Sequence, residues 1–369
     1  MTSASPVSQI HHSAPELVTP LPRHRFDEQA LARWLANRLD VPVPQLSVRQ
    51  FQGGMSNPTF LVTWPSGRRM VLRRKPPGVL LPKAHAIDRE YRILAALAPT
   101  GLPTPEVIAL CEDTSVIGAE FFLMDYIDGR IVTDRAMGPI PRDQRPALAF
   151  SLIDTLADLH RLDWRACGLG DFGRPAGYLA RQTARWSGQY EASKAALPAD
   201  FDYRDMDWLR DWLMAHSGVA EEAAITHGDF RLGNMVVHPD QPRVIGVLDW
   251  ELSTIGHPLS DLAYLCLPYR LPPDVMETHD LLAAGLPAER AMLDRYTDRT
   301  GRAGIDDWPV FLAFNCFRSA AIIQGVAARA AQGTASSASA DPVRDGLRAR
   351  RIAGHGAMIA RQHEAGGTT

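Results

Sequence analysis

The sequence has no dense block of basic residues and no long apolar run. Its 369 residues carry a formal net charge of −3, and no cluster of lysine and arginine marks a track for a polyanion. We therefore expect no nucleic-acid partner. The longest apolar runs, such as residues 244–248, are far too short to cross a bilayer, so we also expect no membrane partner.

Cysteine is scarce as well. The four cysteines lie far apart and form no Cys-x-x-Cys pair, which is typical of reduced thiols rather than of a disulfide framework or a zinc site. Residues 1–25 are predicted to form a flexible tail, because the segment is rich in Ser, Pro and His and lacks the apolar stretch of a secretory signal. Both features indicate a cytoplasmic protein. The four positions are Cys111, Cys167, Cys266 and Cys316.

Oxygen-bearing side chains recur at an informative spacing in residues 227–251. The segment reads His-Gly-Asp229-Phe-Arg-Leu-Gly-Asn234, and Asp249-Trp-Glu251 follows fifteen positions after the asparagine. Phosphoryl transfer from a nucleotide needs a carboxylate that orients the acceptor hydroxyl and hard oxygen ligands that hold Mg²⁺ against the phosphates. We predict Asp229 as the catalytic carboxylate, and Asn234 and Asp249 as the metal ligands.

A hairpin between these motifs explains their spacing. Residues 235–238 and 244–249 are apolar and β-branched, and they flank a Pro-Asp-Gln-Pro turn. Asn234 then enters one strand and Asp249 leaves its partner, so both ligands lie at the same end of the ribbon. The Asp-x-x-x-x-Asn interval resembles the catalytic loop of protein kinases. Each motif alone is also compatible with an ordinary turn or strand end, whereas the ordered pair favours the metal site.

The first part of the chain predicts a helix at 26–39 and strands at 46–51, 59–64 and 70–73. The loop at 52–57 contains Gly53 and Gly54, which lack a Cβ and let a ligand approach the backbone. With Ser56 and Asn57 this loop is a candidate phosphate cradle. A tight turn between strands is the alternative.

A charged pair is predicted behind that loop. Alternation along the third strand places Arg73 on the same face as Val71, pointing to where a phosphate could lie. The predicted helix at 84–97 has Glu90 on an inward stripe, where a carboxylate needs a cation. Arg73 is the candidate partner, and a surface network with Arg89 or Arg92 is the alternative.

Two further strands, at 107–111 and 120–126, complete an N-lobe of residues 26–127. Met124, Asp125 and Tyr126 belong to the predicted hinge, whose backbone would pair with an adenine edge while Met124 limits the depth of the pocket. Residues 128–369 are mostly helical and form the predicted C-lobe. The aromatic stretch 172–212 is either a substrate lid or an ordinary helical surface.

These motifs resemble the aminoglycoside phosphotransferase and choline kinase superfamily over roughly residues 26–330. Segments 53–57, 71–78, 88–91 and 257–263 look most like the kinase-like domain of some acyl-CoA dehydrogenases. The resemblance implies an α+β, protein-kinase-like, two-lobed fold with a small antiparallel sheet and a larger helical lobe. It further implies that Glu90 anchors the phosphate-binding cation and that Asp261 braces the catalytic loop through backbone hydrogen bonds.

Three departures from that family pattern bear on function. Arg73 stands where the family usually has lysine, and Glu251 stands where glycine often follows the metal aspartate, adding a possible further ligand. The third departure is a mixture of acids and arginines, so specificity for a polycation does not follow. These residues are Asp200, Asp202, Asp205, Asp207, Asp211, Arg181, Arg185, Arg318 and Arg329.

Together the motifs and the resemblance imply an ATP- and Mg²⁺-dependent phosphotransferase acting on a hydroxyl of a small molecule, with a hydroxyacyl-CoA or related metabolite as one acceptor class. A nucleotide-binding pseudokinase scaffold and an aminoglycoside-type antibiotic kinase are the alternatives. A protein kinase is disfavoured because no Asp-Phe-Gly to Ala-Pro-Glu segment follows Asp249. The sequence does not indicate whether the protein is a monomer or an oligomer.

Overall fold

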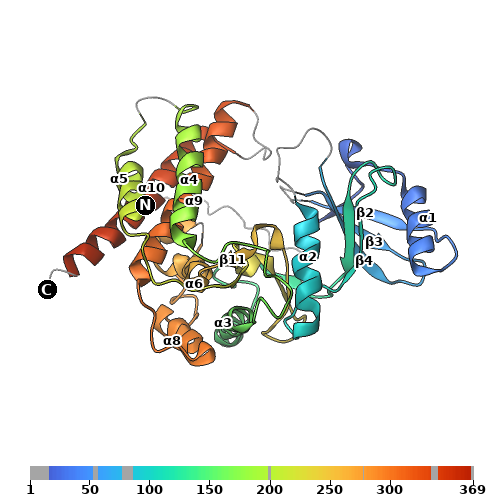
Figure 1. The fold of residues 1–369 in the computed structure, drawn as a ribbon, viewed down its shortest axis with the longest axis horizontal. Coiled ribbons are helices and arrows are strands. Elements are labelled where there is room, and N and C mark those ends of the chain that lie inside the picture. Colours follow the sequence, from blue (N-terminus) through green and yellow to red (C-terminus); the bar gives the residue numbers. More distant parts are fainter. Residues whose placement is uncertain are drawn as a thin grey trace, which may run out of the picture.

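The chain folds into an N-lobe built on a β-sheet and a C-lobe built mainly of helices (Figure 1). The computed structural model describes residues 16–52, 57–76, 86–197, 201–276, 278–333 and 340–366. The lobes meet where strand β6 of the N-lobe runs on into strand β7, which belongs to a different sheet. The α+β, kinase-like architecture predicted from the sequence is confirmed.

The N-lobe sheet has the strand order β1-β2-β3-β4-β6-β5, and every neighbouring pair is antiparallel. Its strands are β1 Leu17–Val18, β2 Ser47–Phe51, β3 Thr59–Thr63, β4 Arg69–Arg74, β5 Val107–Cys111 and β6 Phe121–Asp125. Its helices are α1 Glu28–Leu39 and α2 Ile87–Leu97. The predicted helices and strands of this lobe are present. Strand β1 was missed, because it lies in the predicted flexible tail of residues 1–25, of which residues 1–15 are outside the described part of the chain.

Alternation along β4 sends its side chains to two different cores. Met70 and Leu72 pack with Leu31 and Leu35 of α1, which covers the outer face of the sheet. Val71 packs on the α2 side, in a core that continues into the C-lobe. Arg73 has the same parity as Val71, so the strand carries its guanidinium toward the space between the lobes.

The C-lobe holds two small sheets among its helices. The order β10-β9-β7 forms one sheet and β11-β8 the other. The strands are β7 Arg130–Ile131, β8 Ala224–Thr226, β9 Met235–Val237, β10 Val244–Val247 and β11 Thr254–Gly256. The helices are α3 Arg145–Arg161, α4 Tyr178–Lys194, α5 Arg204–Ala215, α6 Pro258–Cys266, α7 Pro273–Met276, α8 Glu289–Thr300, α9 Trp308–Ala331 and α10 Pro342–Gly366.

Helix α9 packs among the other helices of the C-lobe. With 24 residues it is, by length and composition alone, apolar enough to cross a membrane, although no continuous apolar run reveals this. In the structure 72% of its most apolar stretch is buried, and it packs against α4, α6 and α10. Such burial is typical of the core helix of a helical lobe.

The aromatic stretch 172–212 also packs in the C-lobe core. Trp186 and Tyr190 of α4 and Trp212 of α5 are each at most 6% exposed. Helix α4 lies along α9, and α5 contacts both α4 and α10 (Figure 1). This packing favours an ordinary helical part of the lobe over a substrate lid.

Candidate active site

The segment from His227 to Asn234 leaves β8 as a tightly held loop. Gly228 has φ +84°, and a Cβ at this position would lie 2.6 Å from the carbonyl oxygen of Leu252. Only glycine fits this left-handed and crowded position. The His227 ring accepts a hydrogen bond from Asp229 N–H at 3.2 Å through Nδ1, and its Nε2 donates to Leu248 O at 2.9 Å. The loop is thereby tied to the residue that precedes Asp249.

Asp261 of α6 braces this loop, as the family resemblance implied. Its two carboxylate oxygens accept hydrogen bonds from the N–H groups of His227 at 2.6 Å and Gly228 at 2.9 Å. His160 Nε2 lies 3.6 Å from the same carboxylate, and His160 Nδ1 is 2.7 Å from the hydroxyl of Tyr296. Burial opposes ionisation, but the hydrogen bonds and charge of these neighbours hold the pKa of Asp261 below its usual value.

We expect Asp261→Asn to destabilise the fold by about 3 kcal/mol, because an amide has a single uncharged acceptor oxygen and leaves one of the two buried backbone N–H groups without any acceptor. Urea denaturation followed by circular dichroism measures this loss. Asp240→Asn, in the exposed turn between β9 and β10, is the matched control. A loss no larger than that of the control would contradict the bracing role.

The β9–β10 hairpin brings Asn234 and Asp249 together as predicted. Val247 pairs with Met235 in an antiparallel register, and Leu248 N–H donates to Asn234 O at 2.8 Å. Asp249 follows with φ 68° and ψ 62°, a left-handed conformation that is uncommon for residues other than glycine. Such local strain is concentrated at functional sites, and here it turns the carboxylate out of the strand end.

Asn234 also contacts the predicted catalytic carboxylate. Its Nδ2 donates to Asp229 Oδ2 at 2.8 Å and to Asp229 O at 2.9 Å. The amide nitrogen is thus committed, and Oδ1 is the atom of Asn234 that remains for a cation. Arg231 Nε lies 3.2 Å from the same Asp229 oxygen, a contact that sequence reasoning missed although Arg231 stands within the motif.

Arg73 joins the N-lobe to this constellation. Its Nε lies 3.0 Å from Glu90 Oε2, while its Nη2 lies 3.3 Å from Asp249 Oδ1 and 3.7 Å from Glu251 Oε2. The predicted Arg73–Glu90 pair is therefore present. The alternative network is wrong, because Arg89 donates to the carbonyl of Phe172 and Arg92 pairs with Asp171.

Burial gives Glu90 unusual acid–base behaviour. Only 1% of its side chain is exposed, and this desolvation raises the pKa of Glu90 to about 7 even though Arg73 stabilises the charged form. The carboxylates of Asp249 and Glu251 raise it further. Near neutral pH the strength of the Arg73–Glu90 pair is therefore expected to depend on pH.

This shift predicts that stability depends on pH. Because the folded-state pKa of Glu90 lies above its usual 4.5, its stabilising contribution is complete below pH 4.5 and is lost as pH rises through about 7. Without nucleotide or divalent ions, we expect the free energy of unfolding to fall by about 2–3 kcal/mol more in wild type than in Glu90→Gln between pH 5 and pH 8. Urea titrations of the two proteins at each pH measure this difference in the free energy of unfolding. Identical pH profiles for wild type and Glu90→Gln would contradict the raised pKa of Glu90.

The predicted ligands suit Mg²⁺ chemically. Asn234 Oδ1 and the carboxylates of Asp249 and Glu251 are hard oxygen donors, and 36% of the Asp249 side chain is exposed. Among the residues that the structure describes, no three His, Cys, Asp or Glu side chains gather as a closed metal cage. An open site of this kind fits Mg²⁺, which usually keeps waters and phosphate oxygens as ligands.

The nucleotide side of the site is only partly described. Gly53, Gly54 and Ser56 lie outside the described residues, so their phosphate contacts stay predictions, and Asn57 is 2% exposed.

The hinge needs a correction. Asp125 N–H donates to Glu106 O and Tyr126 N–H to Arg69 O, so neither amide is available to an adenine. Pairing of β6 with β4 and the approach of residue 106 occupy these donors. Met124 is 6% exposed, and its role in limiting the depth of the adenine pocket stays a prediction.

Comparison with known proteins agrees with this geometry. Residues 47–296 match the model of the phosphotransferase enzyme family. The chain belongs to this family. This phosphotransferase is 41% identical over 333 residues to acyl-CoA dehydrogenase family member 11 of Rattus norvegicus, covering 87% of the chain and 42% of the relative. Member 10 of Mus musculus is 39% identical, covering 85% and 29%. The chain thus spans less than half the length of these relatives.

Solved structures show the same fold. A crystal structure from Ralstonia eutropha, assigned as an aminoglycoside phosphotransferase, has 40% identity and a TM-score of 0.80, covering 92% of this phosphotransferase and 99% of that chain. Choline kinase from Cryptosporidium parvum has 13% identity and a TM-score of 0.61, covering 87% and 91%. The aminoglycoside phosphotransferase APH(4)-Ia, solved with ADP and hygromycin B, has 14% identity and a TM-score of 0.59, covering 90% and 98%. At these low identities the last two show the fold alone.

One more contact of the phosphotransferase was missed by sequence reasoning. Arg318 of α9 donates to the carbonyl of Gly228, and its guanidinium lies between the rings of Trp186 and Tyr264 at 5.5 and 5.2 Å. It is 6% exposed. Arg318 therefore stabilises the catalytic loop through the carbonyl of Gly228. The sequence alone does not show this contact, because it depends on how α9 packs in the folded chain.

Proposed function

We propose that this protein is an ATP- and Mg²⁺-dependent phosphotransferase that phosphorylates a hydroxyl group of a small molecule. The observation that carries the proposal is the convergence of Asp229, Asn234 and Asp249 at one end of the β9–β10 hairpin, facing the Arg73–Glu90 pair. We further propose a cytoplasmic location, since the four cysteines carry no disulfide.

The proposed reaction follows from these groups. The bond between the γ-phosphorus and the β,γ-bridging oxygen breaks, the acceptor oxygen forms a new bond to that phosphorus, and ADP leaves. Asp229 orients the hydroxyl and accepts its proton, which passes to solvent. Bound Mg²⁺ would neutralise phosphate charge, with Asn234 and Asp249 as its protein ligands. Arg73 would add positive charge on the nucleotide side.

A hydroxyacyl-CoA or a related metabolite is our proposed acceptor. The support is sequence similarity to acyl-CoA dehydrogenase family members 10 and 11, although the chain spans only 29% and 42% of their lengths. The arginines around Asp229 suit an acceptor of negative charge better than a polycation.

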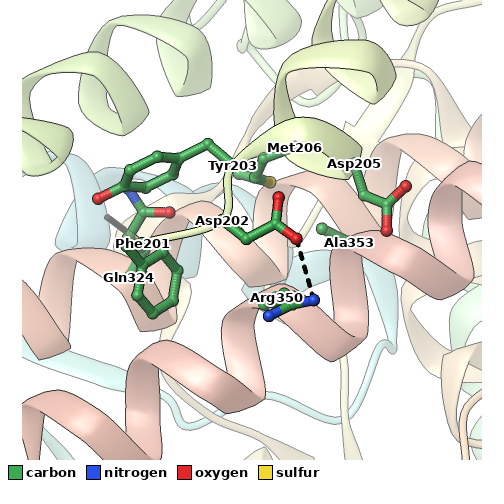
Figure 2. Close-up of a pocket in the computed structure, with 8 residues that line it drawn as sticks. All are labelled: Phe201, Asp202, Tyr203, Asp205, Met206, Gln324, Arg350 and Ala353. Atoms are coloured by element: carbon green, nitrogen blue, oxygen red, sulfur yellow. Dashed lines mark ion pairs between the residues drawn. The ribbon is translucent and has the colours of Figure 1, made fainter. Parts of the chain in front are cut away.

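An antibiotic kinase is the weaker candidate, because the described acids of the run at 200–211 are paired with basic residues rather than free to bind a polycation. Figure 2 shows Asp202 facing Arg350, with an ion pair of 3.0 Å, in a recess of about 10 Å³ beside Asp205. This volume holds no more than a water molecule. The remaining described acids of the run have partners as well: Asp205 with Arg361, Asp207 with Lys194, and Asp211 with Arg210.

A scaffold without transfer activity is the second alternative, motivated by Arg73 in place of lysine. Incubating the purified protein with γ-labelled ATP and a panel of hydroxy acids, their CoA esters, amino alcohols and aminoglycosides separates these possibilities. We expect label transfer to an acceptor that depends on Mg²⁺. Nucleotide binding without loss of the γ-phosphate to any acceptor or to water would favour the scaffold.

A further inference from the structure

A small pocket lies directly beside the catalytic loop. Its interior measures about 50 Å³, and its walls come from α3, the catalytic loop, α6, α8 and the connecting segments that carry Arg135, Tyr269 and Leu281. Apolar residues such as Leu152 and Met292 line most of it, and the lining also includes Arg135, Arg231 and two tyrosines. Since Arg231 also contacts Asp229 at 3.2 Å, the pocket borders the predicted catalytic carboxylate.

Arg135 is the unusual member of this lining. It is half-buried, yet it has no hydrogen bond or ion pair to any of the residues that the structure describes. Arg231 and Arg348 are the positive charges near it, while the nearby negative charge is that of Asp229. Burial, together with these like charges, lowers the pKa of Arg135. A partly desolvated guanidinium without an anion is destabilised, and a ligand oxyanion would relieve that cost.

Two tyrosine hydroxyls in the same lining also lack protein partners. The hydroxyl of Tyr269 is buried and makes no hydrogen bond within the described part of the chain. Tyr264 is half-buried in the electrostatic field of Asp229, Arg135 and Arg231, and no hydrogen bond to its hydroxyl is present among those residues. Native proteins pair nearly all buried polar groups, so the buried hydroxyl of Tyr269, unpaired among the described residues, beside the likewise unpaired and half-buried Arg135 and Tyr264 in one lining, points to a ligand with polar atoms.

We propose that Arg135, with Arg231 and Tyr264, binds an oxyanion carried by the phosphate acceptor, and that the apolar wall contacts the aliphatic carbons between this oxyanion and the reacting hydroxyl. The proposal rests on the proposed function and specifies its acceptor as an aliphatic alcohol bearing a carboxylate or a phosphate. Arg135 is then a specificity-determining residue. A planar guanidinium suits either oxyanion, because it can donate two parallel hydrogen bonds.

Four six-carbon alcohols that differ only at the far end test this inference: ω-hydroxyhexanoate, ω-hydroxyhexyl phosphate, hexanediol and aminohexanol. Isothermal titration calorimetry with Mg²⁺ and AMP-PNP gives the affinity of each. We expect at least one anionic probe to bind about 10-fold or more tightly than the neutral diol, and the ammonium probe to bind most weakly. Which anionic probe binds more tightly distinguishes a carboxylate from a phosphate.

Variants distinguish a direct contact between Arg135 and the oxyanion from a general effect of positive charge near the pocket. Arg135→Gln should lower the preference for the anion about 10-fold, and Arg135→Lys should keep part of it. Arg348→Gln removes a neighbouring positive charge outside the pocket lining and should change the preference much less. AMP-PNP affinity should be the same in all three variants, which shows that each is folded.

Three results would overturn the inference: equal binding of the neutral and anionic probes, full anion preference in Arg135→Gln, or no binding of any probe by protein that binds Mg²⁺ and AMP-PNP. The same titrations without nucleotide keep the two proposals apart. If wild type bound no nucleotide while the anion preference depended on Arg135, the proposed function would fail and the oxyanion site would stand.

Discussion

Replacing Asp229 with alanine is expected to lower turnover by about 10²–10⁴-fold while nucleotide affinity stays within about twofold. The carboxylate contacts the acceptor hydroxyl in the proposed reaction and has no assigned contact with the nucleotide. Its partners Asn234 and Arg231 lie on the same loop, so the loop keeps its Asp261 brace in the variant. Turnover of the acceptor and calorimetric affinity for Mg²⁺ and AMP-PNP measure the two quantities.

Asp240→Ala is the control, since Asp240 is exposed in the turn of the same hairpin. It should match wild type in both measurements. Turnover of Asp229→Ala at the wild-type rate would show that another group orients the hydroxyl. Equal losses of turnover and nucleotide affinity would instead indicate that Asp229 belongs to the nucleotide site.

Asp249→Ala is expected to abolish the gain in nucleotide affinity that Mg²⁺ provides, a loss of about 100-fold or nearly 3 kcal/mol. The change removes a carboxylate that follows strand β10, at the end of the hairpin where Asn234 enters β9, and that pairs with Arg73. Calorimetric titration of ATP with and without Mg²⁺ gives the difference directly.

Because Asp249 also pairs with Arg73, a second variant separates the two roles. Asp249→Asn keeps a hydrogen-bond acceptor for Arg73 Nη2 but is a weaker ligand for Mg²⁺. It should lose most of the metal-dependent affinity while ATP binding without metal is unchanged. A metal-dependent gain in Asp249→Ala equal to that of wild type would contradict the ligand assignment.

Local patterns predicted much of the site. The hairpin between Asn234 and Asp249 followed from two β-branched runs and a proline-rich turn, and the structure confirms that the two strands pair in antiparallel orientation. The Arg73–Glu90 pair followed from alternation on a strand and a helical stripe, because both periodicities fix which way a side chain points. These features depend on residues close in sequence or on the chemistry of a buried charge.

Long-range packing accounts for most of what the sequence did not reveal. The hinge amides of Asp125 and Tyr126 looked free, yet strand pairing and residue 106 use them, and no local pattern encodes that pairing. Arg135 and Arg318 come from a loop and a distant helix, and only the folded chain brings them beside the catalytic loop. Neither residue belongs to a motif, so the sequence offered no signal for them.

We expect one divalent ion to bind between Asn234 and Asp249, with a nucleotide bound between the two lobes. A crystal structure with Mn²⁺ and AMP-PNP, with anomalous scattering to locate the metal, tests it most directly. We predict a manganese peak within about 2.5 Å of Asn234 Oδ1 and an Asp249 carboxylate oxygen, bridged to the phosphates. Nucleotide bound elsewhere, or metal that contacts neither side chain, would contradict the account.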